Sequence, residues 1–328
     1  MNDLVRVYGL TVRSEVPLHL RRPVPAGIPV DLEIGLGAPA AQTAAMPPGR
    51  VLLDLRGSRR YYAATAVDQG FRLRFFGTCD VDLDRSLTRA TVHPVPGADP
   101  GLLSVLVSGT MLAFVLTMRG AAVLHASAVQ VGDAALAFVG ASGMGKSTMA
   151  TLLCADGARL VTDDVLRFDP TSSPPTCALG ATELRLRKGA DHLSERFANQ
   201  LGSAPGLRTT GDARQALAAR PATTEDLPIA ALVVPVPDHS PERRTTEITR
   251  LSPREAMVVL SQFPRLLGWQ DASIRRASFQ QLADVVDQVP VHVAVLPWGP
   301  PFQEDIASQL LQATGLSADR CAGIGAAV

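Results

Sequence analysis

The residues with the clearest capacity for chemistry lie in one short stretch that matches the phosphate-binding pattern GxxxxGK[ST] in full. Glycines let such a loop curl so that its backbone N–H groups point at phosphates, and the positive end of the following helix adds to the attraction. Lys146 has the reach to contact β- and γ-phosphates, and the Ser147 hydroxyl is a ligand for Mg²⁺. The stretch therefore predicts a site for ATP and Mg²⁺. The residues expected around the nucleotide are Gly140, Ala141, Ser142, Gly143, Met144, Gly145, Lys146, Ser147 and Thr148.

The segments on either side of this loop support the prediction. An apolar run at 134–139 is typical of a strand, and the sequence TMATLLCADG that follows Ser147 is typical of a helix. A strand before the loop and a helix after it is the context that a P-loop requires. The alternative, a surface glycine loop, lacks such flanks.

Two carboxylates follow the next expected strand, at 159–162. Asp163 and Asp164 end that strand, and strand ends beside a P-loop lie at the edge of the sheet where ligands bind. Mg²⁺ prefers oxygen ligands, so one carboxylate can hold the metal, while the other can accept the proton of an attacking hydroxyl. A solvated turn is the alternative, but the position one helix and one strand past the loop favours a functional pair.

A histidine and these two motifs form an ordered series. His125 alone would be interpreted as a hydrogen-bonded core residue of a strand. The order His125, loop, then Leu-Val-Thr-Asp163-Asp164 resembles that of HPr kinase/phosphorylase. The resemblance implies an α/β fold with a P-loop kinase core of the HPr kinase and phosphoenolpyruvate-carboxykinase-like type. It also implies that Asp164 is the catalytic base, that Asp163 is a metal partner, and that His125 acts near the transferred phosphate. Together with Lys146 of the loop, Asp164 and His125 are the expected catalytic residues.

A further short string extends the resemblance. Thr182-Glu183-Leu184-Arg185 is similar to the family's Glu-Ile-Arg-Gly, which implies that Glu183 helps Ser147 and Asp163 to hold the metal; an exposed charged strand is the alternative. The family's glycine-rich continuation is replaced by Leu-Arg-Lys at 186–188. This departure leaves open whether HPr is the acceptor and whether the reverse phosphorolysis occurs.

The acceptor is suggested by a second, looser resemblance. The strings VYGLTVRSEVPL near the N-terminus and VLHASAV around His125 are similar to the shorter HPr-kinase-like proteins of ribosomal peptide biosynthesis, including lasso-peptide kinases. This implies transfer to a serine hydroxyl of a precursor peptide or protein. A small-molecule kinase of the same fold and a nucleotide-gated module that binds a peptide or partner protein without transfer are the alternatives.

The elements that must position these residues are predicted from periodicity. Short alternating runs predict an N-terminal β-rich domain at 1–98, an apolar helix at 99–120 is expected to act as a bridge, and a P-loop kinase domain is expected at 121–328. Gly132-Asp133 predicts a hairpin turn before the loop. Buried strands are predicted at 227–237 and 291–298, and helices at 253–263, 278–288 and 304–314.

Two regions allow more than one interpretation. The uncharged run at 101–118 is long enough to span a membrane, but Ser, Gly and Thr interrupt it, so a buried helix and no membrane contact are expected. The stretch 200–225 lacks a period and is predicted to be mobile. Its arginines Arg208, Arg214 and Arg220 could clamp a phosphate or a carboxylate, although a solvated surface is favoured. Trp269 and Trp298 are assigned to no site.

Charge and cysteine usage limit the class of protein. Thirty-one Lys and Arg balance thirty-one Asp and Glu, which argues against nucleic acid as a partner. The N-terminus lacks the charged and apolar regions of a secretion signal, and four dispersed cysteines fit a reducing cytoplasm. The resemblance to a hexameric family permits a homo-oligomer. The cysteines are Cys79, Cys154, Cys177 and Cys321.

Overall fold

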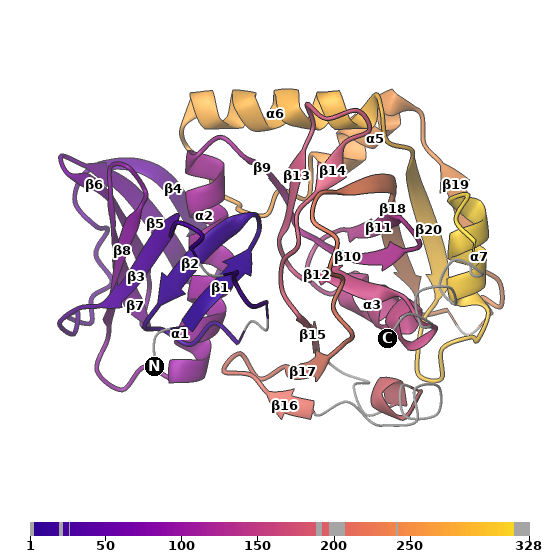
Figure 1. Ribbon diagram of the computed structural model, residues 1–328, viewed down its shortest axis with the longest axis horizontal. Coiled ribbons are helices and arrows are strands. Elements are labelled where there is room, and N and C mark those ends of the chain that lie inside the picture. The colour runs from indigo at the N-terminus through magenta and orange to yellow at the C-terminus, as the bar shows by residue number, and fades with distance from the viewer. Residues whose placement is uncertain are drawn as a thin grey trace. The chain divides into compact units, whose positions relative to one another are not determined.

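The computed structural model of the chain divides into two compact units (Figure 1). Unit 1 comprises Met1–Ala121, Thr210–Asp212 and Arg265–Phe279, and unit 2 comprises the rest of the chain. The linear division expected from the sequence does not include the two later segments that return to unit 1. The residues that the structure describes are 3–19, 22–25, 27–187, 192–196, 207–240 and 242–317.

Unit 1 is built on a mixed sheet of eight strands among the described residues. The strands run in the order β1-β2-β3-β8-β7-β6-β5-β4, and the pairs β2–β3 and β3–β8 are parallel while the others are antiparallel. Alternating apolar and polar residues explain the strands, because one side chain in two points into the core. The strands are β1 (Asp3–Val7), β2 (Leu10–Ser14), β3 (Leu32–Leu36), β4 (Arg50–Arg56), β5 (Arg60–Val67), β6 (Gly70–Phe75), β7 (Cys79–Asp84) and β8 (Arg89–Pro94).

The uncharged run forms one continuous helical stretch, Pro100–Met118, in unit 1. It consists of α1 (Pro100–Leu106), a π-helical turn η1 (Val107–Met111) and α2 (Leu112–Met118). Among the described residues it is the one helix long and apolar enough to cross a membrane, and most of it is buried.

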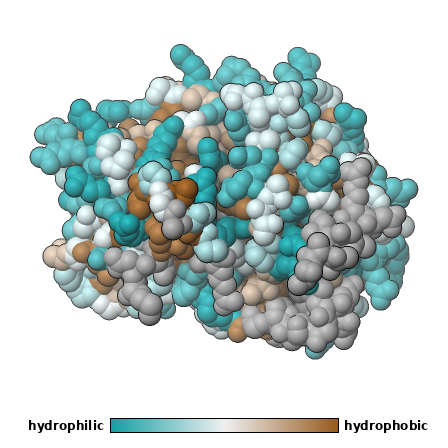
Figure 2. Space-filling view, in the orientation of Figure 1, coloured by the Kyte–Doolittle hydropathy of each residue, from teal (hydrophilic) through white to brown (hydrophobic). Residues whose placement is uncertain are grey.

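The environment of this helix is that of a core. Within unit 1, the Phe114 ring stacks on Trp269 with centroids 5.7 Å apart and meets Phe71 edge-on. On the face shown in Figure 2, hydrophilic side chains predominate and apolar ones lie among them in separate patches. The burial is that of a core helix in a soluble protein. The helix is part of unit 1.

The segment Arg265–Phe279 returns to unit 1 and pairs with the edge strand β4. The backbone N–H of Asp54 donates to the Gly268 carbonyl at 3.0 Å, and Gln270 N–H donates to the Leu52 carbonyl at 2.8 Å. Gly268 has a φ of 94°, and a Cβ there would collide with the Asp54 carbonyl. This segment thus requires glycine at position 268.

Asp271 lies within this segment, just before α6 (Ala272–Val286), and loss of its carboxylate is expected to weaken the fold. The carboxylate accepts hydrogen bonds from the Ser273 hydroxyl and backbone N–H and pairs with Arg50 at 2.7 Å. The Ser273 hydroxyl and then Arg50 hold the pKa of Asp271 well below its usual range. We expect Asp271→Ala to lower the free energy of unfolding by about 1 kcal/mol at pH 7, as for a lost helix cap, and Asp271→Asn by less.

The pH dependence of that loss follows from the direction of the shift. Because the folded-state pKa lies below the unfolded one, the stabilisation is complete above the unfolded pKa of about 4 and disappears as pH falls below it. Urea unfolding of wild type and Asp271→Ala at pH 7 and at successively lower pH measures both effects. Equal stability of the two proteins at pH 7 would contradict the prediction.

Unit 2 contains a nine-stranded sheet and a small three-stranded one among its described residues. The main sheet runs β12-β10-β11-β18-β14-β13-β9, with β20 paired to β18 and β19 to β20. The predicted hairpin is confirmed, since β10 and β11 pair antiparallel around Gly132 and Asp133. The main-sheet strands are β9 (Ala122–Leu124), β10 (Ala126–Val131), β11 (Ala134–Val139), β12 (Arg159–Thr162), β13 (Leu166–Asp169), β14 (Thr176–Cys177), β18 (Leu227–Asp238), β19 (Glu247–Arg250) and β20 (Val291–Pro297).

The small sheet corrects one expectation. It is formed by β15 (Glu183–Leu186), β17 (Gln215–Ala218) and β16 (Leu207–Thr209), in that order. The stretch 200–225, which was predicted to be mobile, contains two short strands. Ala-, Thr- and Arg-rich segments show no period, but β17 pairs through its backbone with β15, and β16 pairs with β17. Residues 200–206 lie outside the described residues.

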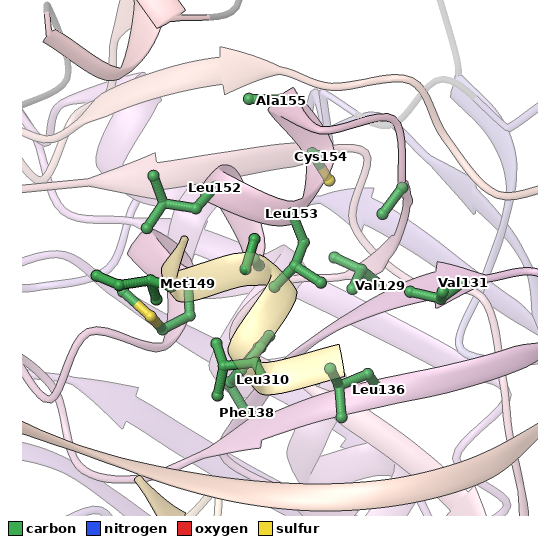
Figure 3. Close-up of a cluster of buried hydrophobic side chains, with 14 of the residues drawn as sticks. Val129, Val131, Leu136, Phe138, Met149, Leu152, Leu153, Cys154, Ala155 and Leu310 are labelled. Carbon is green, nitrogen blue, oxygen red and sulfur yellow. The ribbon is translucent and has the colours of Figure 1, made fainter. Parts of the chain in front are cut away.

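Helices cover both faces of the main sheet in unit 2 (Figure 1). Leu136 and Phe138 of β11 pack on one face with residues of α3 and α7, such as Met149 and Leu310 (Figure 3). Val139 points to the other face, into a cluster with residues of α5 and α6. Unit 2 is thus a mixed α/β structure whose sheet is buried on both sides. The helices are α3 (Lys146–Ala155), α5 (Pro253–Leu260), α7 (Ile306–Ala313) and α6 (Ala272–Val286), of which the part from Gln280 onward belongs to unit 2.

The buried cysteines are expected to be unreactive in the folded protein. Cys79, Cys154 and Cys177 are free thiols, and burial raises the pKa of Cys79 and of Cys177 to about 12. Because the thiolate is the reactive form, iodoacetamide at pH 8 should label neither of these two until denaturant is added. Peptide mass spectrometry separates them from Cys321, which lies outside the described residues. Rapid native labelling of Cys177 would contradict the burial.

Candidate active site

The glycine loop, residues 140–145, connects β11 to the first turn of α3. Gly143 and Gly145 have φ values of 96° and 87°, which side chains rarely adopt. A Cβ on Gly145 would also overlap the indole of Trp298, whereas space is open around Gly143. Gly145 therefore has two separate reasons to be glycine, and its backbone turns the chain into the start of α3 at Lys146.

Lys146 is buried and folds back over the glycine loop. Its side chain is 6% exposed, and Nζ donates a hydrogen bond to the Ala141 carbonyl at 2.9 Å. The ammonium group is thus held at the beginning of the loop, although the backbone of Lys146 follows the last residue of the loop. This places a positive charge against the first residues of the loop.

Asp163, at the end of β12, is the centre of a buried hydrogen-bond cluster. Its side chain is 3% exposed, and Oδ1 accepts from the hydroxyls of Ser147 at 2.8 Å and of Ser127 at 2.5 Å. Oδ2 accepts from the backbone N–H of Arg185 at 2.9 Å. Three donors on one carboxylate fix its orientation and, through it, that of the Ser147 hydroxyl.

Asp164 is held in a left-handed conformation, with φ of 75°. His125 Nε2 lies 3.2 Å from its Oδ1, and Arg185 Nη2 donates to its Oδ2 at 2.8 Å. The backbone also ties His125 to the glycine loop, because the Gly140 N–H donates to the His125 carbonyl at 3.3 Å. The histidine, the loop and the second carboxylate are thereby brought into one arrangement.

A pocket of about 250 Å³ in unit 2 collects most of the expected site residues. It contains both carboxylates, the histidine and much of the loop. Gly140, Ala141, Met144 and Glu183 are not among its lining residues. The residues that line it are His125, Ser142, Gly143, Gly145, Lys146, Ser147, Thr148, Asp163, Asp164, Arg185, Leu186, Arg187, Arg214 and Trp298.

Glu183 is directed to a different partner from the one expected. Its Oε2 accepts from Arg208 Nη2 at 2.6 Å, across the small sheet. Within the described residues, no group of three or more His, Cys, Asp or Glu side chains is arranged to hold a metal. Mg²⁺ nevertheless does not require such a cage, since it usually keeps several waters and uses one or two protein oxygens with substrate phosphates. The paired oxygens of Ser147 and Asp163 fit that requirement.

Several residues at or next to the pocket were not assigned from the sequence. Ser127 does not line the pocket but donates to Asp163, and a serine in a strand gives no distinct signal. Trp298 follows β20, and its ring meets Phe302 edge-on with centroids 5.2 Å apart. Arg214 was considered and does line the pocket, whereas Arg208 pairs with Glu183.

The fold and site define a mixed α/β protein with several sheets and a glycine loop beside paired carboxylates. No protein-family model and no curated protein matches the chain. Among solved structures, it is distantly similar to the Hpr(Ser) kinase/phosphatase from Coxiella burnetii. That similarity has 11% sequence identity and a TM-score of 0.29, and it covers 59% of this chain and 98% of the other. At this level the comparison carries no argument for an activity.

Proposed function

We propose that this chain binds ATP with Mg²⁺ in the pocket of unit 2 and transfers the terminal phosphoryl group to a hydroxyl, in the manner of an HPr-kinase-like enzyme. The observation that carries the proposal is the hydrogen bond from the Ser147 hydroxyl to Asp163, directly beside Asp164 and the glycine loop. A metal-ligating hydroxyl, a buried carboxylate and a second carboxylate in one pocket are the parts that phosphoryl transfer requires.

The roles of the residues follow from their positions. Lys146 and the loop N–H groups would bind the phosphates, and Ser147 with Asp163 would hold Mg²⁺, which when bound neutralises phosphate charge. Asp164 is proposed to accept the proton of the attacking hydroxyl through Oδ1, the oxygen that faces His125. His125 would position that oxygen, since its own backbone is tied to the loop.

The acceptor is proposed to be a serine hydroxyl of a peptide or protein, and the location the cytoplasm. These finer assignments rest on the resemblance in the sequence and not on the pocket. Incubation with Mg-ATP and peptides that carry serine, threonine or alanine at otherwise identical positions, followed by mass spectrometry, tests them. We expect a phosphoryl group to be added to the serine peptide and not to the alanine peptide. If no peptide gains a phosphoryl group, the proposal of a peptide acceptor is contradicted.

One observation favours a second candidate, a nucleotide-gated binding module. Asp164 is already paired with Arg185 at 2.8 Å, so its carboxylate has a structural partner besides any proton it would accept. A module of this kind would bind nucleotide and a partner protein but form no phosphorylated product. Partner binding with unchanged affinity in Asp164→Asn, and no product with wild type, would support it.

A further inference from the structure

Two arginines that the phosphoryl-transfer proposal leaves without a role both line the pocket. Arg187 directly follows β15 and Arg214 directly precedes β17. These antiparallel strands pair with Leu186 opposite Gln215, so the two arginines extend the same end of the ladder by one position on each strand.

Arg187 contacts the glycine loop directly. Its Nη2 donates a hydrogen bond to the Ser142 hydroxyl at 2.7 Å. The neighbouring residue of the loop, Ala141, accepts from Lys146 Nζ. Because the lysine of such a loop reaches the β- and γ-phosphates, the part of the loop at Ala141 and Ser142 is the end that faces the terminal phosphate.

The positively charged side chains of the pocket differ in the partners that they contact. Arg185 is paired with the Asp164 carboxylate, and Lys146 is buried against the loop. Arg187, by contrast, is exposed and donates to a neutral hydroxyl. A phosphate is a stronger acceptor for a guanidinium than a hydroxyl is, because both partners are charged and two parallel hydrogen bonds can form. Arg187 would therefore gain by donating to a phosphate oxygen in place of the Ser142 hydroxyl.

We propose that Arg187, with Arg214 beside it, binds the γ-phosphate of the nucleotide and thereby distinguishes ATP from ADP. This inference rests on the proposed function of the same pocket. It gives the small sheet a role in nucleotide binding, because β15 and β17 carry two cations to the terminal-phosphate end of the glycine loop. Where charge builds on the transferring group, an arginine in this position would also stabilise it.

The test compares two nucleotides that differ in the γ-phosphate. Calorimetric titrations with Mg-ADP and with the Mg complex of β,γ-imido-ATP are made on wild type, Arg187→Ala, Arg187→Lys and Arg214→Ala. Arg187→Ala is expected to weaken the imido-ATP complex about tenfold or more and to leave the ADP complex within about twofold. Arg187→Lys should recover part of the loss, since lysine binds phosphate as a point charge. Arg214→Ala should show a smaller loss of the same kind.

Arg220→Ala is the matched control, because Arg220 is an exposed arginine of the same unit that does not line the pocket. It should change neither affinity. Equal weakening of both nucleotides by Arg187→Ala, or no change in either, would overturn the inference while the proposed function stands. Failure of wild type to bind either nucleotide would overturn both.

Discussion

Asp164→Asn is expected to reduce phosphoryl transfer by a factor of about 10² to 10⁴, because a positioned general base contributes that much to proton transfer. Asparagine has the same shape and tolerates the left-handed backbone at φ of 75°, so the local fold should persist. The amide cannot accept the hydroxyl proton as the carboxylate does. The affinity for Mg-ATP should stay within about threefold, because Asp163 and Ser147 are untouched.

Rates of product formation and calorimetric ATP affinities, measured on the same preparations, check this separation. Asp156→Asn is a matched control, since Asp156 also pairs with an arginine, Arg196 at 3.0 Å, but lies outside the pocket. The control should transfer at the wild-type rate. Full activity in Asp164→Asn would exclude this carboxylate as the base.

Lys146→Ala is expected to have the largest effect on nucleotide binding. Lys146 is 6% exposed, and its ammonium group is held against the loop by the Ala141 carbonyl. A hydrogen bond to a charged group contributes about 1.5 to 3 kcal/mol, which corresponds to a loss of roughly 10- to 150-fold in ATP affinity. Transfer should fall further, because the same charge acts on the developing phosphate charge.

Titration of Lys146→Ala and Lys146→Arg with Mg-ATP measures this loss. Arginine keeps the charge but is larger and planar, so it should restore binding only in part at this buried position. A thermal melt of each variant shows whether the fold persists. Unchanged ATP affinity in folded Lys146→Ala would mean that the loop does not bind phosphates.

Much of the site's geometry was predictable because it depends on local sequence. The hairpin, the strand at 159–162 and the helix after the loop are each specified by patterns within a few residues. Once the sheet forms, the spacing from loop to carboxylates brings Ser147 and Asp163 into contact. The roles assigned to these residues remain predictions.

The features that were missed depend on pairing between distant segments. Gly268 and Trp269 pair with β4 in unit 1, although more than 200 residues of sequence lie between β4 and this segment. No local pattern indicates such a partner. Arg187 and Arg214 are brought to the same end of the small sheet by the pairing of β15 with β17, which no local pattern predicts. Glu183 was expected at the metal, but β16, on the far side of β17 in the small sheet, supplies Arg208 as its counter-charge.

The central claim is that the glycine loop binds ATP. Its most direct test is chemical labelling of lysine, because the sequence contains two lysines. Lys146 and Lys188 are the lysines of the whole sequence. An acyl-phosphate derivative of ATP that acylates nearby lysines should label Lys146, and excess Mg-ATP should prevent the labelling, as read by peptide mass spectrometry. Label at Lys146 that Mg-ATP blocks is the predicted result. Absence of label at Lys146, or label that Mg-ATP does not reduce, would contradict the assignment of this pocket to ATP.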